Sequence, residues 1–246
     1  MRWLTAIPVY NEAKSVQAVL AEVRRFSPEI LVVDDGSTDA TPDLLNAESG
    51  LLRITHTPNR GYGAALRSAF QFAIDHHYDV LVTMDCDGQH EPSRIPVLLE
   101  AISDCDIVSG SRYLRDFRQN TPVPEERLQI NRLVSAELNQ RFGLNLTDAF
   151  CGFKAYRVNA LQQLNITENG WGMPLQLWVQ ASKLGLRVRE VGVPRVYLDA
   201  SRAFGGMLND PQERLAHYRR VIDAAEAEFV APCQNESAWA CRELCS

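Results

Sequence analysis

The sequence has no long apolar run. No stretch within its 246 residues approaches the roughly 20 consecutive apolar residues that a membrane-spanning helix needs. The opening segment reaches Asn11 and Glu12 too early for a secretory signal peptide. We therefore expect a cytoplasmic protein, whose only membrane contact would be a peripheral one at the inner face.

Metal-type cysteine spacing is also missing. The six cysteines form no Cys-x-x-Cys pair, and the three in the C-terminal tail have no histidine nearby. Neither a zinc site nor a disulfide framework is predicted, and the thiols should be reduced. The net charge of -6 argues against a nucleic-acid partner.

Repeats, linkers and low-complexity tracts are absent as well. With 46% hydrophobic residues, the chain can bury one substantial core. We predict a single domain over residues 1–230, followed by a tail, 231–246, whose role the sequence does not indicate.

Two phosphate-binding motifs are missing. The sequence has no GxxxxGKS, and "NRGYGAAL" (59–66) places Leu66 where a dinucleotide fingerprint has Gly or Ala. A P-loop and a Rossmann cofactor site are therefore not predicted. Arg60 and Gly61 before a helix N-terminus would still suit an anion, although the glycines could equally serve only close helix packing.

Short apolar segments alternate with amphipathic ones along the first half of the chain. This alternation predicts an α/β fold with a largely parallel sheet. Strands are predicted at 3–9, 30–33, 51–55, 79–84, 106–110, 187–191 and 194–198, and the later helices at about 125–141, 173–184 and 211–229.

Three polar motifs each follow a predicted strand: "PVYNE" (8–12), "VDDGST" (33–38) and "DCDGQ" (85–89). Parallel strands end at one rim of the sheet, so these motifs should meet in a crevice, where open α/β sheets bind ligands. The carboxylate of Asp34 can accept hydrogen bonds from a base or ribose, and Tyr10 with Glu12 offers an aromatic face and an acceptor. Helix capping would explain the Gly, Ser and Thr of this motif, but it does not explain Asp34 at the end of the strand.

Asp85 and Asp87 are one residue apart. On extended backbone their side chains would point the same way and could hold Mg²⁺ or Mn²⁺. An acidic solvated turn is the alternative. An EF-hand is excluded, because Gln89 and Pro96 occupy positions of its ligands.

Together, six motifs resemble a family-2 inverting glycosyltransferase of the GT-A fold, most similar to its polyprenyl-phosphate (dolichyl-phosphate) hexosyltransferase branch. The resemblance implies one Rossmann-like three-layer domain with a mostly parallel central sheet, and it covers residues 5 to about 205. The motifs are "PVYNE", "VVDDGSTDAT", "NRGYGAA", "MDCDGQHEP", "SGSRY" and "DAFCGFKAYR".

The resemblance implies a hexose donor such as GDP-mannose or UDP-glucose, and a divalent cation, Mg²⁺ or Mn²⁺. It assigns donor binding to Pro8, Tyr10, Glu12, Asp34, Asp35, Arg60, Gly61 and Cys86, and the metal to Asp85, Asp87 and Gln89. Catalytic roles fall to Asp85, Asp87, Asp148 and Arg202, and acceptor binding to Arg112, Arg132, Ser135 and Arg202.

The acceptor decides what the nucleophile needs. A phosphate monoester arrives ionised and needs only positioning, whereas a hydroxyl must lose a proton, for which Asp148 is the candidate base. A turn or capping role for Asp148 is equally open. Alternatives to a polyprenyl-phosphate transferase are an enzyme acting on a soluble hydroxyl acceptor and a non-catalytic nucleotide-sugar-binding protein.

Overall fold

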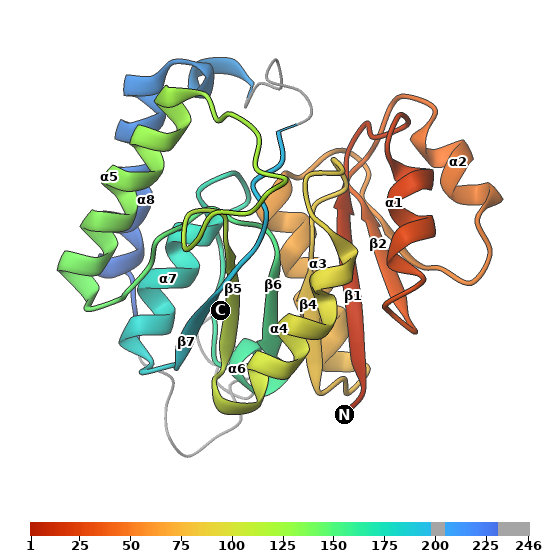
Figure 1. The fold of residues 1–246 in the computed structure, drawn as a ribbon, viewed down its shortest axis with the longest axis horizontal. Helices are drawn as coiled ribbons and strands as arrows, with labels where there is room; N and C mark the ends of the chain where they lie inside the picture. Colours follow the sequence, from red (N-terminus) through yellow and green to blue (C-terminus); the bar gives the residue numbers. More distant parts are fainter. Residues whose placement is uncertain (198–204, 231–246) are drawn as a thin grey trace, which may run out of the picture.

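The computed structural model describes residues 1–197 and 205–230, and these form one seven-stranded sheet with helices on both faces (Figure 1). The sheet has the order β3-β2-β1-β4-β6-β5-β7. Its strands are β1 (Trp3–Val9), β2 (Ile30–Asp34), β3 (Leu52–Thr55), β4 (Val80–Thr83), β5 (Ile107–Ser111), β6 (Lys154–Arg157) and β7 (Val188–Gly192).

The helices divide between the two faces. One apolar core lies under α1 (Val16–Val23), α2 (Thr41–Ala47) and α4 (Ile95–Ala101). The other lies under α3 (Tyr62–Asp75), α5 (Glu125–Phe142), α6 (Val158–Leu161), α7 (Met173–Lys183) and α8 (Pro211–Ala227). Three short 3-10 helices complete the described elements: η1 (Pro92–Arg94), η2 (Ile102–Asp104) and η3 (Gly206–Asn209).

The strands are apolar on both sides because helices cover both faces. In β1, Leu4 and Ala6 belong to one core, while Ile7 and Val9 belong to the other. All five residues of β2 are buried. A parallel sheet packed between two helix layers requires such continuous burial. This is why the strands appear in the sequence as short, uninterrupted apolar runs.

The strand β6 was not predicted. It runs antiparallel between β4 and β5, with Ala155 opposite Val82 on one side and Val108 on the other. It has four residues, with Lys154 at one end and Arg157 at the other, so it carries neither an apolar run nor an apolar–polar alternation. The remaining pairs in the sheet are parallel, as predicted.

The predicted strand at 194–198 is wrong over its described residues, 194–197, which are irregular. This segment packs against the loop before α5 instead of extending the sheet. Arg195 and Tyr197 donate their backbone N–H groups to Asn120 Oδ1 (2.9 Å) and Thr121 Oγ1 (2.7 Å). Together with one backbone bond, from the Thr121 N–H to the Arg195 carbonyl (2.8 Å), these side-chain acceptors take the place of the strand pairing that the apolar pattern suggested. None of the described helices is long and apolar enough to cross a membrane.

Gly63 tests how closely α3 packs. A Cβ at this position would lie 2.3 Å from the Glu168 carbonyl oxygen and 2.8 Å from Met173 Cβ. Alanine normally stabilises a helix interior by about 1 kcal/mol over glycine. Here we expect Gly63→Ala to destabilise the protein, because overpacking against backbone costs about 1–3 kcal/mol. Urea denaturation measures the change.

Gly143→Ala is the matched control. Its φ is 65° and no atom lies within 4 Å of the added Cβ, so only backbone strain of about 1 kcal/mol applies. Equal or smaller destabilisation at Gly63 would contradict the close approach.

Candidate active site

A cavity of about 680 Å³ opens at the carboxyl ends of the central strands. The three motifs predicted to converge all contribute to its wall, which confirms their meeting at one rim. The predicted site residues that line it are Pro8, Tyr10, Glu12, Asp35, Gly61, Asp85, Cys86, Asp87, Gln89 and Arg112.

The other predicted residues lie elsewhere. Arg60 and Arg132 are exposed and, like the buried Asp34, Ser135 and Asp148, are not part of the cavity wall. Arg202 lies outside the described residues. Asp34 accepts hydrogen bonds from the Ser37 backbone N–H (3.0 Å) and the Arg53 guanidinium (3.2 Å).

Asp85 is held from three sides. The Tyr62 hydroxyl donates to one carboxylate oxygen (3.0 Å) and His90 Nε2 contacts the other (3.1 Å). On the third side is Gly152, where a Cβ would come within 2.4 Å of the carboxylate. Any residue larger than glycine at 152 would therefore displace Asp85.

These contacts keep Asp85 charged. Burial alone would raise the pKa of its carboxyl, but hydrogen bonds from His90 and Tyr62 and the charge of Lys154 outweigh burial and lower the pKa. Burial and the neighbouring Asp85 raise the pKa of the Tyr62 phenol well above its usual value. The hydroxyl therefore stays protonated and donates a hydrogen bond to Asp85.

The backbone around Asp87 differs from the prediction. The strand β4 ends at Thr83, and residues 86–88 form a bend, so the extended-backbone argument for parallel side chains is wrong. Asp87 instead turns one carboxylate oxygen to accept the Gln89 backbone N–H (3.0 Å). Both aspartates nevertheless line the same cavity.

The chemistry of this corner fits a hard divalent cation. The described residues contain no cluster of three or more His, Cys, Asp or Glu that could hold a metal alone. Magnesium, however, is usually bound by one or two carboxylates together with substrate phosphates. Asp85 and Asp87, with the Gln89 amide oxygen, offer that donor set beside a cavity large enough for a ligand.

Arg112 and Asp148 form a buried ion pair. Arg112 Nε and an Nη donate to the two oxygens of Asp148 at 2.7 and 2.9 Å, and Asn131 adds a third donor at 2.7 Å. Burial alone would raise the pKa of Asp148, but the charge of Arg112 lowers it. Asp148 thus orients Arg112, which reaches the cavity.

Sequence reasoning missed several cavity residues. Arg127 lines the wall, whereas the predicted Arg132 on the same helix does not. The ring of Trp171 stacks on Tyr62, with centroids 5.0 Å apart. The further unpredicted lining residues are Val9, Asn59, Ala65, His90, Tyr113, Ile130, Asn131, Phe150, Gly170, Pro174, Tyr197, Gly205, Arg214 and Tyr218. Seven of these residues stood inside the recognised motifs, namely Val9, Asn59, Tyr62, Ala65, His90, Tyr113 and Phe150. The others lie outside every motif, so the sequence carried no usable signal for them.

The family model for "Glycosyl transferase family 2" matches residues 5–164. An undecaprenyl-phosphate mannosyltransferase from Micrococcus luteus is 36% identical over 221 residues, which cover 85% of this chain and 90% of that protein. A polyprenol monophosphomannose synthase from Mycolicibacterium smegmatis is 31% identical over 203 residues, with 78% and 76% covered.

The fold is similar to that of solved GT-A transferases. Glucosyl-3-phosphoglycerate synthase from Mycobacterium tuberculosis, crystallised with Mg²⁺ and UDP, superposes with a TM-score of 0.66 and 20% identity. The superposition covers 91% of this chain and 77% of that one. It confirms the predicted fold class.

We expect Asp148→Asn to destabilise the protein by about 3–5 kcal/mol at pH 7, because it leaves the Arg112 charge buried without its partner. The folded-state pKa of Asp148 is lowered, so its contribution is present above the unfolded pKa of about 3.9 and is lost as pH falls through the folded value. Urea denaturation between pH 7 and pH 3 should therefore show the deficit of the variant shrinking in acid.

The exposed Asp75, at the end of α3, provides the control. Asp75→Asn should change stability by less than about 0.5 kcal/mol. A deficit of Asp148→Asn that stays constant down to pH 3 would show that the ion pair is not its cause.

Proposed function

The chain belongs to glycosyl transferase family 2, and we propose that it moves a hexose from a nucleotide-diphosphate sugar to a polyprenyl phosphate. One observation carries the proposal: a single cavity brings together the two carboxylates of "DCD" and the arginines Arg112, Arg127 and Arg214. Acidic and basic groups in one cavity suit a metal-bound diphosphate beside a second phosphate.

The donor occupies the end of the cavity near β1 and β2. There Tyr10 is 48% exposed and presents a ring face, while Glu12 and Asp35 provide acceptors for a nucleoside. The diphosphate then extends toward Asp85 and Asp87. GDP-mannose and UDP-glucose are the donors we propose to test. The name of the Micrococcus luteus relative specifies mannose transfer, and the structural neighbour was crystallised with UDP.

The acceptor phosphate occupies the opposite end, between the loop after β5 and the helices α5 and α8. Arg112 comes from that loop, Arg127 from α5 and Arg214 from α8. A guanidinium matches the planar, bidentate geometry of a phosphate better than an ammonium group does. Arg112 and Arg127 can therefore hold a phosphate monoester, together with Arg214, which also pairs with Glu126 and donates to the Leu208 carbonyl (2.8 Å).

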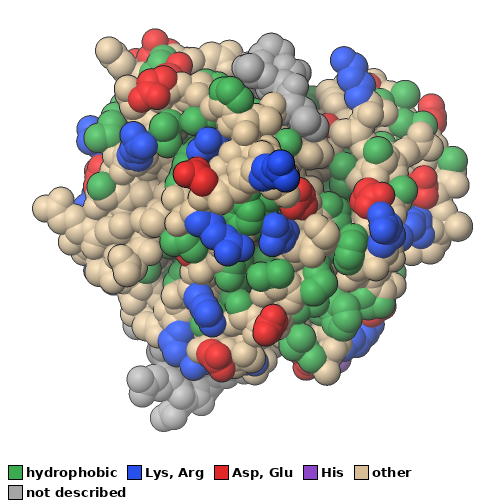
Figure 2. Space-filling model, in the orientation of Figure 1, with side chains coloured by type: hydrophobic (Ala, Val, Ile, Leu, Met, Phe, Trp, Pro, Cys, Tyr) green, Lys and Arg blue, Asp and Glu red, His purple; other side chains and the backbone are tan. Residues whose placement is uncertain are grey.

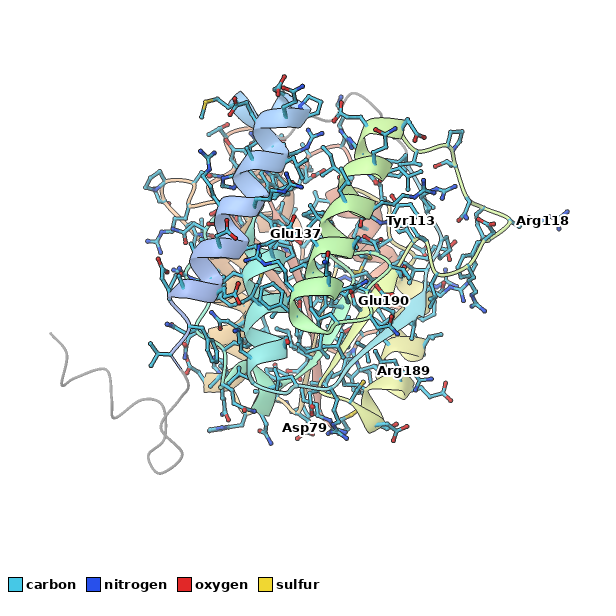
Figure 3. All side chains as sticks on the ribbon, turned by 90° about the vertical axis from the view of Figure 1, so that its left-hand side faces the viewer. Asp79, Tyr113, Arg118, Glu137, Arg189 and Glu190 are labelled. Atoms are coloured by element: carbon cyan, nitrogen blue, oxygen red, sulfur yellow. The ribbon has the colours of Figure 1, made fainter. Side chains whose placement is uncertain are left out.

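A lipid acceptor brings the cavity mouth to a membrane surface. The loop between β5 and α5, residues 112–124, carries Arg115 and Arg118, and Arg115 lies over the ring of Phe117, as does Arg94 of η1. Lys and Arg side chains gather near the centre of the face in Figure 2, and Arg118 projects from the same loop in Figure 3. We propose that this loop makes a peripheral contact with anionic headgroups.

The transfer needs no base on the protein. An oxygen of the acceptor phosphate attacks the anomeric carbon, the carbon–oxygen bond to the nucleoside diphosphate breaks, and the configuration inverts. A phosphate monoester, with a second pKa of about 6, is already ionised. The arginines hold it in line, and Asp148 orients Arg112. A cation on Asp85, Asp87 and Gln89 would stabilise the charge on the leaving diphosphate as a Lewis acid.

A transfer assay tests this function. Wild type should move hexose from GDP-mannose or UDP-glucose to a short polyprenyl phosphate, and EDTA should abolish the transfer. Asp85→Asn should lower kcat/KM by about 100-fold or more, because the leaving group loses its stabilisation. Asp79→Asn, the same change at the other end of β4 (Figure 3), should leave the rate near wild type. Undiminished transfer in EDTA would rule out the metal role.

Two of the arginines of α5, Arg127 and Arg132, allow the cavity wall to be compared with the exposed surface of the same helix. Arg127→Gln should raise the KM for polyprenyl phosphate by about 10-fold or more, since a charge-assisted contact to phosphate is lost. Arg132→Gln removes the same charge five residues away, on the exposed face of the helix, and should change this KM less than about twofold. The reverse ranking would move the acceptor subsite out of the cavity.

A further inference from the structure

A hydrogen-bonded chain of three side chains runs behind the donor end of the cavity. The Ser68 hydroxyl contacts His56 Nε2 at 2.8 Å, and His56 Nδ1 contacts an oxygen of Asp35 at 2.6 Å. His56 and Asp35 are each only 3% exposed. The order serine, histidine, aspartate resembles that of a catalytic triad. Asp35 lines the cavity, but Ser68 and His56 do not, so the serine hydroxyl faces no substrate in it.

The partners fix the tautomer of neutral His56. A carboxylate only accepts hydrogen bonds, so Nδ1 carries the proton of the ring and donates a hydrogen bond to Asp35. Nε2 then accepts a hydrogen bond from the Ser68 hydroxyl. Both ring nitrogens are thereby satisfied, and the ring has one orientation.

Asp35 joins two separate segments of the cavity wall. Its carboxylate accepts the backbone N–H groups of Arg60 (3.0 Å) and Gly61 (2.8 Å), just before the first residue of α3. The Asn59 side-chain amide donates to the Asp35 carbonyl (2.9 Å). Asp35 thus ties the end of β2 to the start of α3.

The tie extends to the other end of the donor subsite. Tyr62, the first residue of α3, follows Gly61 directly and donates to Asp85 at 3.0 Å. A shift in the Asp35 carboxylate would move the start of α3 and with it the hydroxyl that holds Asp85. The position of His56 therefore bears on both ends of a bound nucleoside diphosphate.

We propose that His56, supported by Ser68, is a positioning residue of the donor subsite, which holds Asp35 so that the wall from Asp35 to Tyr62 keeps the shape that a nucleoside diphosphate requires. The proposal rests on the proposed function for the identity of the ligand. It assigns His56 no contact with that ligand, because the histidine acts only through Asp35.

Isothermal titration of GDP and UDP in the presence of Mn²⁺ tests the proposal. His56→Leu removes the donor to Asp35 and should raise the Kd of the bound nucleotide by about 10-fold, as expected when a site loses its supporting contacts. His56→Asn places an amide N–H near the position of Nδ1 and should stay within about threefold of wild type. Ser68→Ala leaves the Nδ1 donor to Asp35 in place and removes only the partner of Nε2, so its Kd should also stay within about threefold of wild type.

Tyr78→Phe is the stability control. It removes a hydrogen bond to Glu29 (3.0 Å) at the far end of the sheet, so thermal unfolding should shift without a change in Kd. A Kd for His56→Leu equal to wild type in folded protein would overturn the proposal, and so would a His56→Asn variant as weak as the leucine one.

The outcomes also separate the proposal from the proposed function. Nucleotide binding without hexose transfer to polyprenyl phosphate would reject the function while the ranking of the His56 variants still decides the positioning role. A wild-type protein that binds neither GDP nor UDP would contradict both.

Discussion

The site depends on keeping carboxylates ionised where burial opposes their charge. Desolvation alone would raise the pKa of both Asp85 and Asp148. For Asp85, hydrogen bonds from His90 and Tyr62 and the more distant charge of Lys154 offset burial, whereas for Asp148 the directly bound guanidinium of Arg112 does so. The first arrangement leaves Asp85 on the cavity wall with negative charge to offer a cation. In the second, the charge of Asp148 is neutralised within the ion pair, which fixes the orientation of Arg112 at the cavity wall.

The antiparallel strand β6 makes this compensation possible. The segment that leads into it brings Asp148 and Gly152 from the second half of the chain to the motifs of the first half. Lys154 at its start is 2% exposed, lies 5.3 Å from the centroid of the Trp178 ring and donates to the Cys151 carbonyl. Burial lowers the pKa of Lys154, while nearby Asp148 and Asp85 oppose that lowering. The central cation and the two carboxylates therefore stabilise one another.

Much of the fold followed from the sequence, because local patterns report local structure. Apolar runs that end in polar turns identified the parallel strands and the rim where their motifs meet. The strand β6 escaped because four residues with charged ends carry no periodic signal. His56 escaped for a different reason: its partners Asp35 and Ser68 are 21 and 12 residues away, and no spacing rule connects them. Contacts of this kind are set by packing, which one sequence does not encode in a short motif.

The helix α5 shows where motif matching stops and geometry takes over. Arg127, Asn131 and Ser135 are spaced by one turn and share a face, while Arg132 is rotated about 100° from Asn131. The inward face is polar for a physical reason, since Asn131 donates to Asp148 and the Ser135 hydroxyl accepts the Ala149 backbone N–H (3.2 Å). Those buried groups would otherwise lack partners, so they fix the rotation of the helix. That rotation, in turn, decides which arginine of α5 reaches the cavity.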